Sequence, residues 1–142
     1  MTGAVIQAQP HIPVPLTPEQ IEEEQRQAET WRAQQAERER VQVEADATAL
    51  ELLESTLTPQ QREDFLKDNA FFVVSKSGKV YQIRKGRQQN IYEMDANRKL
   101  VKKYCVVPQE SDIPTGDILL MQKLLIEHAE DEFLRKANSW AM

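Results

Sequence analysis

The chain has 142 residues, which is enough for one compact domain with little to spare. Hydrophobic residues make up 40%, aromatic residues only 6%, and the formal net charge is −5. No window approaches the roughly 18 consecutive apolar residues of a membrane span, and the first residues lack the pattern of a signal segment. A single cysteine excludes an intramolecular disulfide and a thiolate metal cluster within one chain. We therefore expect a soluble intracellular protein.

Residues 1–17 contain three closely spaced prolines and no helical or alternating pattern, which predicts an extended arm. Apolar residues lie along the arm, although disordered tails usually have few of them because nothing buries them. Two interpretations stay open: the arm lies in a groove of a protein partner, or it is a loose terminus. In the first interpretation, the partner-binding residues of the arm are Ile12, Val14 and Leu16.

Two segments predict the start of a helix. In LTPEQ at residues 16–20, Thr17 can cap the helix, Pro18 suits the first helical position and Gln20 completes a capping box. The segment LTPQQ at residues 57–61 repeats this pattern. We therefore predict helices over 18–56 and 60–68, and three parts of the chain: an arm over 1–17, a long helix over 18–57 with a protruding first half, and a compact α+β domain over 58–142.

The two halves of the long helix differ in their apolar residues. Between residues 19 and 40 the only large apolar residues are Ile21 and Trp31, so this half either projects into solvent or associates with another helix. We take Ile21 and Trp31 as further partner-binding residues. The second half has an apolar stripe that predicts packing on the C-terminal domain. Its members are Val43, Ala47, Leu50, Leu53 and Leu57.

Between residues 71 and 107, short β-rich runs alternate with turn sequences, which predicts four antiparallel strands. The strands are expected over 71–74, 80–83, 90–94 and 100–107, with Gly78 taking a positive φ in the first turn. A final helix over about 117–138, with a kink near Ala129, is expected to cover one face. The fold class is α+β, with a long N-terminal helix and a four-stranded antiparallel β-meander covered by a C-terminal helix.

The meander is strongly basic. Residues 71–108 carry nine basic and two acidic side chains, so the rest of the chain is acidic. Such cations could hold phosphates while Tyr81, Tyr92 and Tyr104 stack on bases. Alternatively, the cations solubilise turns or dock the acidic helix, and the tyrosines point into the core. In the nucleic-acid interpretation, the binding residues are Lys79, Arg84, Lys85, Arg87, Lys102 and Lys103.

Candidates for catalysis or metal binding are weak. His128 and Glu132 stand four residues apart on one helix, but two metal ligands without a third make a poor site. The carboxylates at 127 and 130–132 follow one another around a helix and do not face each other across a cleft. We therefore expect no catalytic residue, no metal, no cofactor and no small-molecule substrate.

Several segments carry a resemblance to a known group. They are YQIRKGR at 81–87 with Asn90 and Ile91, Cys105 followed by Pro108, QKLLIE at 122–127 and FLRKAN at 133–138. Together they resemble small uncharacterised proteins encoded by bacteriophages and prophages, over residues 71–138. The resemblance brings no catalytic residues, and it implies a viral or prophage protein in the bacterial host cytoplasm or in the virion.

Two functional hypotheses follow. The first is a non-catalytic structural or assembly protein that acts through protein contacts of its arm and long helix, as a homo-oligomer or with a protein partner. The alternative is a small nucleic-acid-binding or regulatory factor that uses the basic meander.

Overall fold

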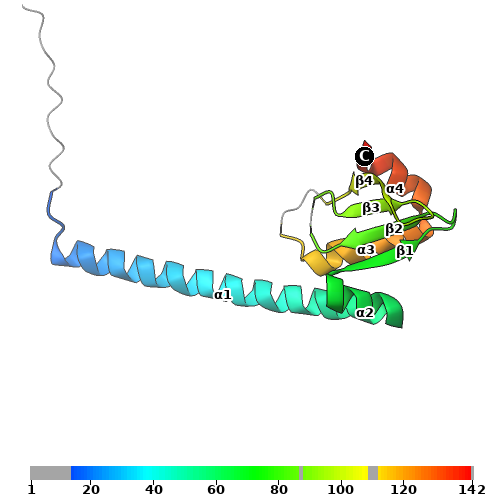
Figure 1. Ribbon diagram of the computed structural model, residues 1–142. Helices are drawn as coiled ribbons and strands as arrows, with labels where there is room; N and C mark the ends of the chain where they lie inside the picture. Colours follow the sequence, from blue (N-terminus) through cyan, green and yellow to red (C-terminus); the bar gives the residue numbers. More distant parts are fainter. Residues whose placement is uncertain (1–13, 87, 109–111, 142) are drawn as a thin grey trace, which may run out of the picture. The chain divides into compact units, whose positions relative to one another are not determined.

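The computed structural model describes residues 14–86, 88–108 and 112–141, and the chain divides into two compact units inside the first helix, between Glu39 and Arg40 (Figure 1). The fold class is α+β, as predicted. The elements are α1 Pro18–Thr56, α2 Pro59–Asp68, β1 Ala70–Val74, β2 Val80–Arg84, β3 Ile91–Met94, β4 Leu100–Cys105, α3 Thr115–His128, α4 Glu130–Lys136 and β5 Asn138–Ala141.

The first unit contains the start of α1, where the predicted capping box forms. The Gln20 N–H donates to the Thr17 hydroxyl at 3.2 Å, and the Thr17 N–H donates to the Gln20 side chain at 2.9 Å. Exposed side chains one turn apart also pair, as in Arg26 and Glu23 at 2.7 Å. Each such pair adds a few tenths of a kcal/mol. Local contacts and strong helix formers therefore account for the helix here, because the buried residues of α1 lie only in the second unit.

In the second unit, α1 becomes buried only near its end. Ala49, Leu53 and Leu57 are buried, whereas Ala47 is exposed and Val43 is 66% exposed. The predicted stripe was therefore wrong for its first two members. Spacing along a helix indicates which residues share a face, but where burial begins depends on which neighbours are present.

The second capping box also forms and connects α2 to the sheet. Gln61 accepts a hydrogen bond from the Thr58 N–H at 3.0 Å, and its N–H donates to the Thr58 hydroxyl at 3.2 Å. The Gln61 side chain also donates to the Phe72 carbonyl of β1 at 2.7 Å. Gln61, a member of the α2 capping box, therefore also forms a hydrogen bond with the backbone of β1.

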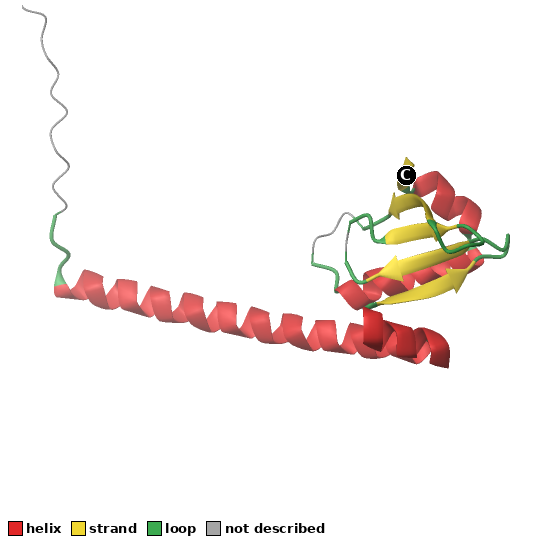
Figure 2. Cartoon of the chain, viewed as in Figure 1, coloured by secondary structure: helices red, strands yellow, loops and turns green. Residues whose placement is uncertain are grey.

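The sheet is an antiparallel meander of five strands, in the order β1-β2-β3-β4-β5 (Figure 2). The first four strands and the positive φ of Gly78, 86°, confirm the prediction. The C-terminal end of the prediction was wrong, because α4 ends at Lys136 and does not continue to residue 138. Ala137 has extended backbone, and residues 138–141 pair with β4 as a fifth strand.

The helices α3 and α4 pack on one face of the sheet, and the break between them falls at Ala129, as expected (Figure 2). α3 also contacts α1 closely: a Cβ atom on Gly116 would lie 2.6 Å from the carbonyl carbon of Ala49. Only glycine fits at this crossing. The core between helices and sheet contains Phe71, Val73, Tyr81, Ile83, Ile91, Tyr104, Leu119, Ile126 and Phe133.

A buried amide pair fixes α3 on the sheet. The side chains of Gln122 and Asn90 exchange two hydrogen bonds, at 2.7 and 3.1 Å. Gln122 also donates to the Val106 carbonyl at 2.9 Å, and Asn90 donates to the Arg84 carbonyl at 3.1 Å. Burial of such groups is costly unless they are paired, so the network favours one position of α3 on the sheet.

Candidate functional site

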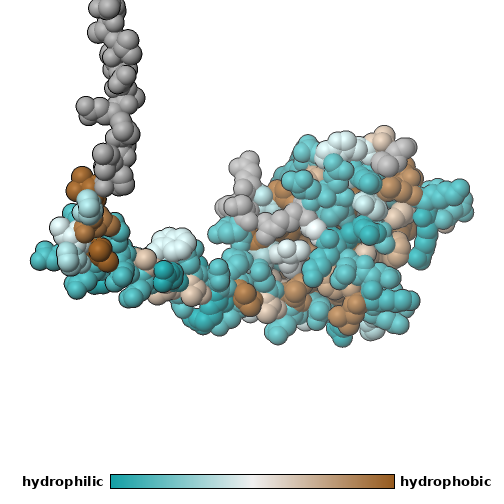
Figure 3. Space-filling model, turned by 60° about the vertical axis from the view of Figure 1, so that its left-hand side comes forward, coloured by the Kyte–Doolittle hydropathy of each residue, from teal (hydrophilic) through white to brown (hydrophobic). Residues whose placement is uncertain are grey.

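The predicted partner-binding residues of the first unit expose large apolar side chains. Val14 is 84% exposed, Leu16 46%, Ile21 43% and Trp31 62%. Ile12 lies outside the described residues. Figure 3 shows hydrophobic surface at the start of α1. This unit therefore carries exposed apolar side chains just before α1 and along its first part.

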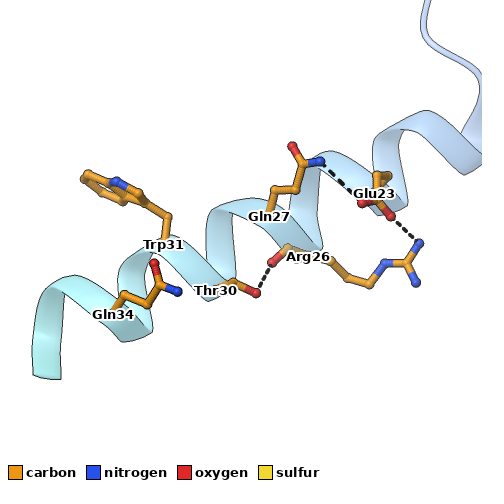
Figure 4. A pocket seen from close by; sticks show the side chains of 6 residues that line it. All are labelled: Glu23, Arg26, Gln27, Thr30, Trp31 and Gln34. Atoms are coloured by element: carbon orange, nitrogen blue, oxygen red, sulfur yellow. Dashed lines mark hydrogen bonds and ion pairs between the residues drawn. The ribbon is translucent and has the colours of Figure 1, made fainter.

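Trp31 stands beside a polar network on α1 (Figure 4). Glu23 accepts hydrogen bonds from Arg26 at 2.7 Å and from Gln27 at 3.3 Å. The Thr30 hydroxyl donates to the Arg26 carbonyl at 2.9 Å. These residues, with Gln34, line an open depression along one side of the helix. An aromatic side chain is thus exposed next to side chains that are already held in place.

The sheet face opposite α3 carries a row of five residues, one from each strand. Cross-strand register places Phe72 opposite Gln82, Gln82 opposite Tyr92, Tyr92 opposite Lys103, and Lys103 opposite Trp140. We call this surface the open face. Trp140 is 42% exposed, and the other four residues are half-buried. Aromatic rings therefore occur on every second strand, with an amide and an ammonium between them.

Cations lie over the rings of the open face. The Arg84 guanidinium is 5.3 Å from the Tyr92 ring centre, and the Lys103 ammonium is 5.0 Å from it. The Arg98 guanidinium is 4.5 Å from the Phe72 ring centre. Among the described strand residues, those whose side chains alternate onto this face include no acidic residue. The surface therefore combines π-faces with positive charge.

The six basic residues of the nucleic-acid interpretation do not form one surface. Of these, Arg84 and Lys103 lie on the open face, and Lys85 is exposed just after β2. Lys79 and Lys102 lie on the opposite side, where Lys79 is 3.8 Å from Glu93 and Lys102 lies over the Tyr104 ring at 5.8 Å. Arg87 lies outside the described residues.

Two of the three tyrosines of that interpretation belong to the core. Tyr81 is fully buried and Tyr104 is 4% exposed. Their hydroxyls donate to Glu130 at 2.8 Å and to Glu93 at 2.9 Å. Burial, followed by these hydrogen bonds to carboxylates, raises the pKa of both tyrosines. Only Tyr92 is on the open face, so stacking on bases by Tyr81 and Tyr104 is excluded in this conformation.

Glu130 anchors the first turn of α4 to the turn between β1 and β2. Burial acts to raise the pKa of Glu130, but hydrogen bonds from Ser77, Ser75 and Tyr81, together with Lys79, outweigh it and lower the pKa. The ionised carboxylate thus accepts bonds from several donors at once. This arrangement holds α4 in place, and nothing in it resembles a pair of carboxylates facing a cleft.

Sequence reasoning missed Phe72, Gln82, Arg98 and Trp140 as members of the open face. Alternation along β1 and β2 was the available signal: Phe71 and Tyr81 share the core face, so Phe72 and Gln82 must face the other way. Trp140 could not be found in this way, because its strand was not predicted.

The two potential metal ligands are not arranged as a site. His128 ends α3 and lies 3.9 Å from Glu127, whereas Glu132 is in α4 and pairs with Lys136 at 2.7 Å. Within the described residues, no group of three or more His, Cys, Asp or Glu side chains is placed to hold a metal ion.

Comparison with protein-family models, with curated proteins and with solved structures found no match to the chain. In the described part of the chain, every helix is too short or too polar to cross a membrane.

Proposed function

We propose that the chain is a non-catalytic structural or assembly protein of a bacteriophage or prophage, which acts through protein contacts of its N-terminal arm and the first part of α1. The proposal rests mainly on the exposure of Trp31, which is 62%. Val14, Leu16 and Ile21 add apolar surface in the same unit. The phage or prophage origin follows from the sequence resemblance over residues 71–138.

Contact would stabilise this surface appreciably. A tryptophan side chain buries roughly 200 Å² when fully covered, and apolar burial contributes about 25 cal/mol per Å². Covering the exposed part of Trp31 would therefore contribute roughly 3 kcal/mol, before the cost of association. Small contributions from Ile21 and Leu16 would add to this. An interface of ordinary affinity needs only a few such side chains.

The surroundings of Trp31 also suit a protein interface. Interfaces commonly place an aromatic anchor inside a polar rim that excludes water. Arg26 and Gln27 both donate to Glu23 on the same side of α1 as Trp31, so these side chains lose less freedom on binding than unpaired ones. The partner is a second copy of the chain or another protein of the same assembly.

Mass measurement by light scattering tests the proposal on the full chain of 16.4 kDa. We expect the wild type to self-associate or to co-purify with a protein of its assembly. The double variant Ile21→Ala/Trp31→Ala should lose that association. Leu66→Ala is the matched control, because Leu66 is 67% exposed but lies on α2. Equal behaviour of both variants would contradict a contact through α1.

Amide hydrogen exchange provides a second measurement. Residues 18–39 should exchange more slowly in the assembly isolated from host cells than in the dilute chain. Equal exchange in both samples would refute the proposed contact.

A further inference from the structure

We infer that the open face of the sheet binds single-stranded nucleic acid, with bases stacking on Tyr92 and Trp140 and phosphates contacting Arg84 and Lys103. This goes beyond the proposed function, since it uses other residues in the second unit. Of the six basic residues expected from the sequence, it keeps Arg84 and Lys103, whereas Lys79 and Lys102 lie on the opposite side of the sheet.

The spacing of the row suits a single strand. Neighbouring strands lie about 4.8 Å apart, so Tyr92 on β3 and Trp140 on β5 stand roughly 10 Å from each other. Lys103 lies between them in register on β4. A single strand crossing the sheet could place a base on each ring and a phosphate near the ammonium group. Gln82, on the other side of Tyr92, accepts a long hydrogen bond from Arg84 at 3.5 Å and lines a depression with Asp64 and Asp68, so it lies outside the proposed path.

The chemistry favours a single strand over a duplex. Aromatic side chains bind nucleic acid by stacking on base faces, and in a duplex those faces are covered by neighbouring bases. The cations over Tyr92 are compatible with binding of a single strand. Arg84 and Lys103 have flexible side chains whose charged groups can turn from the ring toward phosphates. Stacking needs no particular base, so we expect little sequence preference.

Charge decides which part of the open face is used. At the β1 edge, Phe72 and Arg98 share a depression with Asp64 and Asp68 of α2, whose carboxylates would repel phosphates. Toward β3, β4 and β5, the described strand residues of this face include Lys103 and no acidic side chain. The strand should therefore lie over Tyr92, Lys103 and Trp140. The net charge of −5 opposes binding at a distance, but charges farther than about 8 Å are largely screened at physiological salt.

Trp140 gives a direct optical test. The chain has two tryptophans, so in the Trp31→Phe variant Trp140 is the only one. Titration of this variant with a dT20 oligonucleotide at physiological salt should quench its fluorescence as a base stacks on the indole. A duplex of the same length should quench it much less. No quenching by dT20 at physiological salt, or equal quenching by the duplex, would overturn the proposal.

Two neighbouring lysines provide a matched pair of variants. Lys102 and Lys103 are adjacent on β4 but point to opposite faces of the sheet. Lys103→Glu and Lys102→Glu change the net charge equally, so only the face that is altered differs between them. In the Trp31→Phe background, Lys103→Glu should weaken binding to dT20 at least tenfold, and Lys102→Glu should change it little. Each lost phosphate contact should also reduce the slope of log K against log salt by about 0.7. Equal effects of the two variants would overturn the assignment to the open face.

Loss of stacking is measured separately by fluorescence anisotropy of labelled dT20. Tyr92→Ala should weaken binding by about 5- to 150-fold, the range found when one stacked base is lost. Phe72→Ala should have a smaller effect, because Phe72 lies beside the α2 carboxylates. Circular dichroism of each variant checks that the fold persists. Unchanged affinity of folded Tyr92→Ala would overturn the role of stacking. The Tyr92→Ala and Phe72→Ala variants leave Ile21 unchanged. Failure of the nucleic-acid proposal is therefore distinguishable from failure of the proposed protein contact through α1.

Discussion

Replacement of Gly116 by alanine tests the packing of α1 against α3. The added Cβ would lie 2.6 Å from the carbonyl carbon of Ala49, 2.7 Å from its oxygen and 2.7 Å from the nitrogen of Leu50. Ordinary carbon contacts are about 3.5–4.0 Å, so one helix must move by about 1 Å. All three neighbours are backbone atoms, which cannot rotate away.

Overpacking of this kind costs about 1–3 kcal/mol, and the better helix propensity of alanine returns less than about 1 kcal/mol. For a unit of roughly 100 residues, 1 kcal/mol shifts the Tm by about 4 °C. For a net loss of about 1–2 kcal/mol, we therefore expect Gly116→Ala to lower the Tm by about 4–8 °C. Near-UV circular dichroism is the suitable assay, because the buried Tyr81 and Tyr104 report on the core.

Gly86→Ala is the matched control. Its Cβ would lie 3.8 Å from the Cβ of Asn90, which is an ordinary contact, so stability should change by less than about 0.5 kcal/mol. If Gly116→Ala unfolded at the same temperature as Gly86→Ala, the close crossing of α1 and α3 would be refuted.

Two further predictions concern polar groups of the second unit. Gln122→Leu leaves the Asn90 amide without its partner and should cost about 2 kcal/mol in urea denaturation. The double variant Asn90→Leu/Gln122→Leu should cost less than the sum of the single losses by at least about 0.5 kcal/mol, and strictly additive losses would argue against a coupled pair. The pKa of Glu130 is lowered on folding, so its ionised form stabilises the protein above its usual pKa, and this contribution disappears as pH falls through the lowered value. Glu130→Gln should therefore destabilise the protein by about 1–2 kcal/mol at pH 7 and by much less at pH 3, and an equal loss at both values would contradict the role of the ionised carboxylate.

Much of the fold could be predicted because its signals are local. Thr17 and Thr58 sit in repeated capping boxes, and both helices begin where these boxes place them. Gly78 supplies the positive φ of the first hairpin turn, and this turn marks the end of β1 and the start of β2. These features depend on residues close in sequence, so the sequence alone is enough to find them.

The rest depends on residues far apart in sequence. β5 is only four residues long, and no Gly or Pro at its start signals a turn in the sequence. This strand forms because β4 offers an edge with which it can pair. Val43 has the spacing of a buried residue but is 66% exposed. Lys102 and Lys103 look equivalent in the sequence, and only strand register separates the lysine of the open face from its neighbour.

The two edge strands of the sheet, β1 and β5, differ in what contacts their outer sides. At the edge strand β1, the Gln61 side chain donates a hydrogen bond to the Phe72 carbonyl. In the described part of the chain, no strand pairs with the outer side of β5. Backbone groups on such a border can recruit another strand. Among the described residues, addition of a strand at β1 would have to displace the Gln61 hydrogen bond, whereas at β5 it would displace no strand. Pairing with a second copy is therefore easier at β5, where two copies could add their β5 strands to each other about a two-fold axis.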